Sequence, residues 1–415
     1  MSRLSHNQKI ILGVVGIVVL ILILIFLGLI PGLRLPQEKI KADLNFWAVT
    51  DNQGIYQQVT DQFQALHPGV RIIYRRFDLQ TYEKDLINAL AANRGPDIFI
   101  LHNTWLLKHY DKISPLPREK LSFAVFKDQL FPQVVERDFT ANEIIYALPL
   151  SLDTLSLIYN KDIFNQSGVA LAPTTWTEFQ NIIPKLRIID QTGRLTRAAA
   201  AIGGSHKSID RAADLLTVLM LQAGAAMTDQ DFTRAILSLN ALEFYTQFTD
   251  PANPNYTWND SFRYSTDALA EGSVAMIFNY AEKIAELQTK NPFLNIGVAP
   301  LPQNDPANQI NYANYWGYTV SQKSSYPELA WDFILLLTTN ENNVKNYLQA
   351  TNKPPALRSL IRDKQALTAK SWPQIDNNQI EIIFSNMIES VISGKQTAQT
   401  ALSQAEAQIT QLMKK

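Results

Sequence analysis

The chain has 415 residues, of which 46% are hydrophobic, and its 38 acidic residues nearly balance 37 basic ones, giving a net charge of −1. This length suits about two domains, and the charge balance lacks the basic excess of a nucleic-acid-binding protein. Cysteine is absent, which excludes disulfides, thiolate metal sites, cysteine nucleophiles and a lipidated-cysteine anchor.

The first element in chain order is an unbroken apolar run at residues 10–33, without a charged or amide side chain. About 20 helical residues cross a bilayer, so the run is long enough to span one. The alternative is a cleavable signal peptide, whose apolar region is usually about 7–15 residues long and ends at a small-residue site. Here the run is longer, and no Ala-x-Ala pattern follows it. We therefore expect an uncleaved single-pass transmembrane anchor.

The orientation of this anchor rests on its flanks. Basic residues precede and follow the run in nearly equal number, so the positive-inside rule gives a near tie. A short tail before the run and a large domain behind it favour a cytoplasmic N-terminus. We expect a cytoplasmic tail at 1–9, the anchor at 10–33 in the plasma membrane, a linker at 34–42, and a soluble domain on the extracytoplasmic face.

Short strands and helices alternate after residue 43. Strand-like runs at 44–48, 70–74 and 97–101 enclose segments of helical period at 55–66 and 82–90. This order predicts a parallel sheet with right-handed crossovers.

The same rhythm returns in the second half of the chain. Thr175 and Glu178 form a capping box that opens a helix expected to reach Ile189. Further strands are expected at 155–159, 198–202, 274–278, 296–299 and 315–320, with helices at 209–221 and 232–248 and a nearly all-helical tail from 327. Two α/β halves of this kind predict two doubly wound lobes. The sheets of such lobes bind ligands beyond the carboxyl ends of their strands.

Catalytic and cofactor motifs are missing. The sequence contains no P-loop, no H-E-x-x-H and no G-x-S-x-G. None of its five histidines pair at i,i+4 spacing. Spacing alone leaves a glycosidase-type carboxylate pair open, although nothing singles one out. We expect no catalysis, no cofactor and no metal site.

Several segments together resemble the family 1 bacterial extracellular solute-binding proteins, the maltose-binding-protein-like subunits of ABC importers. They are FQALHPGV (63–70), GPDIFIL (95–101), ALPLSLDTLSLIYNKD (147–162), AEGSVAMIFN (270–279) and SGKQTAQTAL (393–402). The resemblance extends over nearly everything after residue 43. The chain departs from the family where Tyr280-Ala281-Glu282 replaces a common Gly-Pro-Trp, and in keeping an apolar helix as its anchor.

The resemblance implies an α/β, two-lobe periplasmic-binding-protein-like fold (type II), here preceded by the transmembrane helix. Residues 43–150 and approximately 280–315 would form the first lobe, and residues 151–279 and approximately 316–415 the second. The chain would cross between the lobes near 148–154, near 276–280 and at about 301–315.

The implied function is that of a membrane-anchored extracytoplasmic solute-binding protein. It would capture a sugar or oligosaccharide between the lobes as a monomer and deliver it to ABC permease subunits, with no nucleic-acid partner. A surface-anchored carbohydrate hydrolase and a ligand-sensing ectodomain are the alternatives. Binding without turnover would argue against the hydrolase, and a neighbouring permease gene rather than a kinase gene would argue against the sensor.

A sugar site needs aromatic platforms and planar hydrogen-bonding groups. Asp153 is the leading polar candidate, because the resembling family often places an acidic ligand contact in this crossover; a capping role is the alternative. Asp51 and Asn52 follow the first strand, where a simple turn role is the alternative.

Three aromatic residues complete the candidate site. Trp316 is the strongest, since it lies beside Gly317 near an expected crossing. Tyr280 follows the strand at 274–278 and could replace the family's missing tryptophan. Trp105 is a possible platform that could instead simply open a helix.

Overall fold

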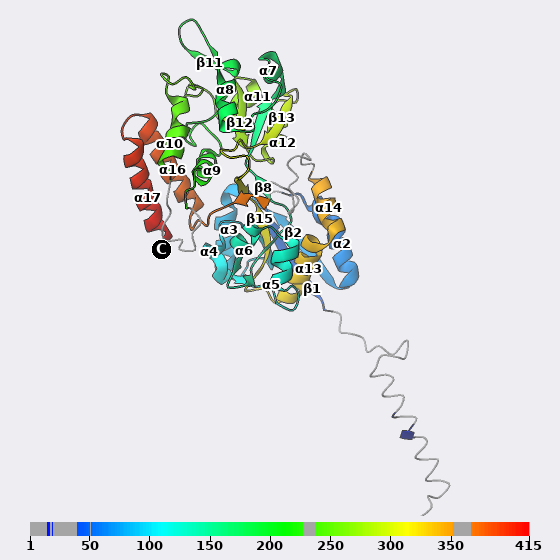
Figure 1. Cartoon of the computed structure of the whole chain (residues 1–415). Helices are drawn as coiled ribbons and strands as arrows, with labels where there is room; N and C mark the ends of the chain where they lie inside the picture. The colour runs from blue at the N-terminus through cyan, green and yellow to red at the C-terminus, as the bar shows by residue number, and fades with distance from the viewer. Residues whose placement is uncertain are drawn as a thin grey trace, which may run out of the picture.

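A computed structural model describes residues 15, 16, 19, 40–49, 51–226, 238–351 and 367–414. The expected anchor at 10–33 therefore lies outside the described residues, apart from three positions within it. None of the helices that can be described combines the length and the apolar character needed to cross a bilayer. The remaining chain forms two α/β lobes (Figure 1).

The first lobe is built on a sheet in the order β2-β1-β3-β15-β4, with β7 added beside β15. These strands are β1 (Ala42–Ala48), β2 (Val70–Arg76), β3 (Ile98–His102), β4 (Ile113–Ser114), β7 (Leu148–Pro149) and β15 (Trp316–Ser321). β1 runs parallel to β2 and β3, whereas β15 runs antiparallel to β3. Four of the five residues of β3 are buried, as expected of a central strand with both faces covered.

Helices cover both faces of this sheet. They are the 3-10 turn η1 (Gln53–Tyr56), α2 (Gln57–Leu66), α3 (Leu79–Ala91), α4 (Leu106–His109), α5 (Phe123–Val125), α6 (Gln133–Phe139), α13 (Pro327–Thr339) and α14 (Glu341–Ala350). In α3, Asp78 caps the N-terminus by accepting from the Gln80 amide. Its buried stripe of Tyr82, Leu86 and Leu90 repeats every fourth residue, which fixes the face turned to the core.

The second lobe has a sheet in the order β10-β11-β12-β9-β13. Its strands are β9 (Ser156–Asn160), β10 (Ile188–Ile189), β11 (Leu195–Ala200), β12 (Val274–Asn279) and β13 (Ile296–Pro300). Its helices are α7 (Lys161–Gln166), α8 (Trp176–Leu186), α9 (Ala212–Gln222), α10 (Leu239–Thr246), α11 (Ser265–Glu271), α12 (Lys283–Lys290), α16 (Asn377–Ile392) and α17 (Ala398–Met413). All six residues of β12 are buried, so this strand lies at the centre of the lobe.

A small sheet joins the two lobes. It has the order β16-β14-β8, made of β8 (Asp153–Thr154), β14 (Asn311–Asn314) and β16 (Ala369–Lys370). Each of these strands lies on a segment where the chain passes from one lobe to the other. We call this three-stranded unit the hinge sheet.

The lobe boundaries expected from the sequence differ from those of the structure. β13 pairs with β9 in the second lobe, although residues 280–315 were assigned to the first. β15, α13 and α14 pack in the core of the first lobe, although residues from 316 onward were assigned to the second. No crossing occurs at 276–280, because β12 and α12 contribute to one core. The periodicity that predicts a strand does not reveal which sheet the strand joins.

Two smaller expectations also change. α8 ends at Leu186 rather than Ile189, because Ile188 and Ile189 pair with β11 instead. The helix expected at 232–248 is described only from Leu239, and residues 232–237 lie outside the described residues.

Candidate functional site

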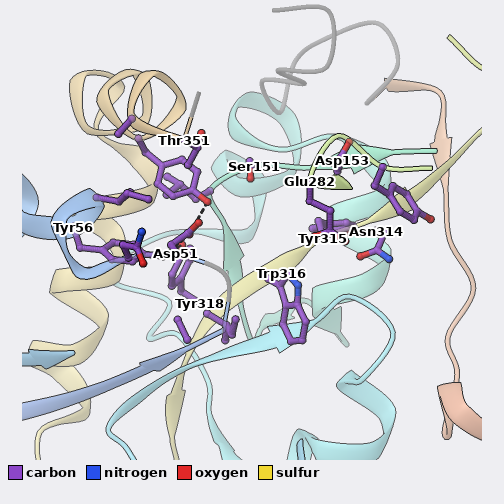
Figure 2. Close-up of a pocket in the computed structure, with 18 of the residues that line it drawn as sticks. Asp51, Tyr56, Ser151, Asp153, Glu282, Asn314, Tyr315, Trp316, Tyr318 and Thr351 are labelled. Atoms are coloured by element: carbon purple, nitrogen blue, oxygen red, sulfur yellow. Dashed lines mark hydrogen bonds between the residues drawn. The ribbon is translucent and has the colours of Figure 1, made fainter. Parts of the chain in front are cut away.

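A cavity of about 390 Å³ lies between the two lobes. The first lobe contributes residues that follow β1 together with β15 and α14, the second lobe contributes the start of α12, and the hinge sheet contributes Asp153 and Asn314. Figure 2 shows Asp51 on one side of this space, Glu282 and Asp153 on the other, and Trp316 between them.

The structure brings five of the six sequence-predicted residues to this cavity. Asp51, Asn52, Asp153, Tyr280 and Trp316 line it. Trp105 does not. It immediately precedes α4, which agrees with the alternative interpretation that this residue opens a helix.

Asp51 is held in place by buried tyrosines. Its Oδ2 accepts hydrogen bonds from the hydroxyls of Tyr56 at 2.8 Å and Tyr347 at 2.9 Å. The Tyr56 hydroxyl also lies 2.9 Å from that of Tyr318. Burial raises the pKa of Tyr56, and the nearby Tyr318 and Asp51 add to the effect. The tyrosine therefore stays protonated and can keep donating to the carboxylate, which fixes the orientation of Asp51 toward the cavity.

Asp153 joins the hinge sheet to the second lobe. Its Oδ1 accepts from the Thr154 amide at 2.9 Å and its Oδ2 from the Ala281 amide at 3.1 Å. Glu282, the next residue along, is exposed and accepts from Arg211 Nη2 at 3.2 Å. This wall of the cavity therefore presents carboxylate oxygens whose positions are set by these hydrogen bonds.

Trp316 is half-buried at the floor of the cavity. Its ring packs edge-on against His102 at 5.0 Å and Trp105 at 5.3 Å between centroids. Trp105 thus supports the platform from behind instead of forming one. Burial lowers the pKa of His102 to about 4, so this histidine is neutral near pH 7, with its Nε2 3.2 Å from Asn314 Oδ1.

Tyr280 cannot serve as the platform that its sequence position suggested. Its side chain is only 1% exposed. Its hydroxyl donates to Asp214 Oδ2 at 2.9 Å, and the Arg211 guanidinium lies 5.2 Å from its ring centroid. Of the aromatic residues lining the cavity in the described part of the chain, Trp316 alone keeps a partly exposed ring.

A second, smaller cavity of about 110 Å³ adjoins the first and shares Asn314 with it. Arg211, Asp214 and Glu381 line this space. Burial raises the pKa of Asp214 to about 6, against the opposing effect of Arg211. Arg211 has a φ of 62° just before α9, a strained conformation for a residue with a side chain.

A lysine extends this charged cluster behind the cavity. Lys283 Nζ lies 3.2 Å from Asp210 Oδ2. Although burial opposes ionisation of Asp210, Arg211 and Lys283 outweigh it and lower the pKa of that carboxyl. Among the residues that can be described, no group of three or more histidines and carboxylates is arranged to hold a metal ion.

Sequence reasoning missed much of this site. Tyr56, Tyr318 and Tyr347 are not singled out by the sequence analysis, and in the structure they are buried. Arg211 directly precedes α9, and Asp214 lies in its first turn, on a helix whose other residues are mostly apolar. Local patterns give no signal for such residues, because the contacts that define them span up to 296 positions.

Comparison with known proteins gives a consistent picture. The family described as "Bacterial extracellular solute-binding protein" matches residues 47–344. The galactooligosaccharide-binding protein of Bacillus subtilis is 22% identical over 392 residues, covering 88% of each chain. The maltotriose-binding protein of Pyrococcus abyssi is 21% identical over 345 residues, covering 81% of this chain and 68% of its relative.

The fold also matches solved structures. The cyclic alpha-maltosyl-1,6-maltose binding protein from Arthrobacter globiformis superimposes with a TM-score of 0.72 at 17% identity. The match covers 90% of this chain and 100% of the other. This similarity establishes the two-lobe periplasmic-binding-protein-like architecture expected from the sequence.

Proposed function

Since the chain belongs to the bacterial extracellular solute-binding protein family, we propose that its ligand is a sugar or oligosaccharide held between the two lobes. Members of this family bind solutes and do not transform them. The expected absence of catalysis agrees with membership of this family. The same membership argues against the alternative of a carbohydrate hydrolase.

The composition of the cavity carries the proposal. Sugars present apolar ring faces and a rim of hydroxyls, so they need a flat aromatic surface surrounded by acceptors and amides. Trp316 offers a partly exposed indole, and Asp51, Asn52, Asp153 and Asn314 surround the same space. The volume of about 390 Å³ falls within the range of about 300–1,000 Å³ common for small-molecule sites.

The relatives support the same ligand class. The two curated proteins above are described as binding galactooligosaccharide and maltotriose, and the matched structure as binding a cyclic maltosyl-maltose. At about 20% identity, the particular sugar that a relative binds does not identify the sugar that this chain binds. The proposal therefore names only the ligand class.

The test is a thermal-shift screen followed by titration calorimetry. The panel holds neutral mono- and oligosaccharides, sugar acids, amino acids and polyamines. A saccharide present at about 100 times its dissociation constant should stabilise the fold by about 2.7 kcal/mol. Stabilisation by an amino acid or polyamine, with every saccharide inert, would overturn the proposed ligand class.

We further propose that residues 10–33 anchor the protein in the plasma membrane with its soluble domain outside the cytoplasm. The apolar length of this run supports the anchor. The full chain should fractionate with membranes, whereas a chain starting at Ala42 should not. A mature N-terminus located beyond residue 28 would contradict the anchor.

Delivery to an ABC permease is the remaining part of the proposed function. It follows from family membership and from a cleft that two lobes can open and close. Uptake of the identified saccharide by cells should require the binding protein, a permease and an ATPase together. Uptake that persists without this binding protein would contradict the assignment.

A further inference from the structure

A buried carboxylate lies where the hinge sheet meets the first lobe. Asp138, on α6, is 4% exposed. Its Oδ2 accepts from Asn103 Nδ2 at 3.0 Å and from the Tyr315 hydroxyl at 2.7 Å. Its Oδ1 accepts from the Ser371 hydroxyl. One side chain thus joins the end of β3 to two other segments that are remote in sequence.

Those two segments are crossings between the lobes. Tyr315 connects β14 of the hinge sheet to β15 of the first lobe. Ser371 directly follows β16 of the hinge sheet and precedes Trp372, which packs in the second-lobe core. The third crossing, β8, is joined to them through its pairing with β14.

Further contacts reinforce the same junction. Arg137, beside Asp138 on α6, donates through Nη2 to the Ser371 carbonyl at 2.6 Å. The Asn103 amide donates to the Tyr315 carbonyl at 3.0 Å. Because α6 belongs to the core of the first lobe through Val134 and Val135, the contacts of Asp138 and Arg137 tie the hinge sheet to the first lobe.

We propose that Asp138 fastens the hinge sheet to the first lobe and so limits the range of angles that the two lobes can adopt. It is a positioning residue, since it reaches the cavity only through Tyr315, which lines it. A rotation between lobes must be absorbed where the chain crosses. With two crossings held by one carboxylate, that rotation is confined to the segments beyond the junction. Any effect on solute affinity rests on the proposed function, whereas the fastening itself does not.

The junction also depends on charge. Burial raises the pKa of Asp138 to about 6, partly offset by the donors Ser371, Asn103 and Tyr315 and by Arg137. The titratable groups around it in the described structure are Arg137 and the hydroxyls of Tyr315 and Tyr312. If the junction opened and exposed Asp138 to water, its pKa would return toward 3.8, so protonation favours the joined state and the fastening should strengthen in acid.

The experiment measures the distance between the lobes without any ligand. The chain has no cysteine, so Lys345→Cys on α14 and Gln288→Cys on α12 can carry the only two spin labels. These helices form opposite rims of the cavity, since Ala350 and Ala285 both line it. Pulsed electron paramagnetic resonance then gives the distribution of interlobe distances at pH 8 and at pH 5.

Two variants test the junction and one serves as a control. Ser371→Ala removes one donor, and Asp138→Asn removes the charge while keeping the shape. Ser324→Ala removes a matched serine–carboxylate bond, from Ser324 to Asp97 at 2.6 Å, that lies within the first lobe. At pH 8 the first two variants should broaden the distance distribution, and Ser324→Ala should match the parent.

Acid should narrow the distance distribution of the parent but not that of Asp138→Asn, which separates Asp138 from Asp214, the other carboxyl with a pKa raised to about 6. Distributions of Ser371→Ala and Asp138→Asn that superimpose on the parent would overturn the proposal, even if both variants lowered the melting temperature. Should Asp138→Asn fail to fold, Ser371→Ala and the pH dependence of the parent decide the outcome. Since no saccharide is used, failure of the proposed function would leave these results unaffected.

Discussion

At the scale of single residues, the side chains of the site fall into two groups: those exposed to the cavity, and buried ones that hold their neighbours in place. In the part of the chain that the structure describes, six aromatic residues line the cavity, yet five are buried and use their hydroxyls or ring faces to hold neighbours. Trp316 differs because its ring remains half-exposed above a layer made of His102 and Trp105. Binding energy from stacking should therefore depend on one residue.

Trp316→Ala tests this dependence. Removing the platform should weaken saccharide binding by about ten- to a hundredfold, equivalent to about 1.5–3 kcal/mol, since well-packed tryptophans often dominate binding energy. Calorimetry with the saccharide found in the screen gives the value. Phe293→Ala is the control, because Phe293 is 93% exposed and lies outside the cavity. Equal affinities of Trp316→Ala and the parent would remove Trp316 from the site.

Asp214 gives the pH dependence of stability a definite sign. Its pKa is raised from 3.8 to about 6, chiefly by burial. Between these values the folded chain holds a proton that the unfolded chain has lost, so this group's contribution to stability falls as pH rises from about 4 to 6. Asp214→Asn should show a weaker decline than the parent in urea unfolding across this window. An unchanged pH profile would argue against a raised pKa.

Among secondary-structure elements, the long strands and helices could be predicted and the hinge could not. β3 contains an apolar run of four residues and β12 an apolar run of five, and each run is recognisable in the sequence. β8 and β16 contain two residues each, too few to show any alternation. Their pairing is decided by contacts between residues more than fifty positions apart, such as Tyr312 with Lys370. The same limitation explains why β13 and β15 were assigned to the wrong lobes.

The site residues also divide into those that could be predicted from the sequence and those that could not. Asp51, Asn52, Asp153 and Trp316 could be predicted because each lies at a strand end or crossing, where α/β folds place ligands. The exposure of Tyr280 could not be predicted, because it depends on Asp214 and Arg211, which lie 66 and 69 positions away and come to rest beside its ring.

β15 offers a test of packing at the scale of an element. It pairs with β3, β4 and β7, and a Cβ on its Gly317 would lie 2.6 Å from Phe139 Cε2. Gly317→Ala should therefore lower the free energy of unfolding of the first lobe by about 1–3 kcal/mol. Gly54→Ala is the control, since nothing lies within 4 Å of its built Cβ. Urea denaturation compares the two, and equal stabilities would mean that Phe139 can move aside freely.

In the whole molecule, the two lobes have separate apolar cores. The cluster of the first lobe shares no buried residue with the two clusters of the second. One contact between the lobes is the hydrogen bond from Thr104 Oγ1 to Asn377 Oδ1 at 2.9 Å. Lobes joined in this way behave as units that can rotate and unfold with partial independence.

Ligand binding should therefore couple the unfolding of the two lobes. Without saccharide, calorimetry of the chain from Ala42 should resolve two transitions, and Gly317→Ala should lower the melting temperature of only the transition that belongs to the first lobe.

A saccharide held by Asp51 in one lobe and by Glu282 in the other is released when either lobe unfolds. At about 100 times its dissociation constant it adds about 2.7 kcal/mol to the cost of unfolding the weaker lobe. The lower transition should then move toward the upper one and merge with it. Two transitions that keep their separation at saturating saccharide would mean that the bound sugar contacts a single lobe, contrary to a site between them.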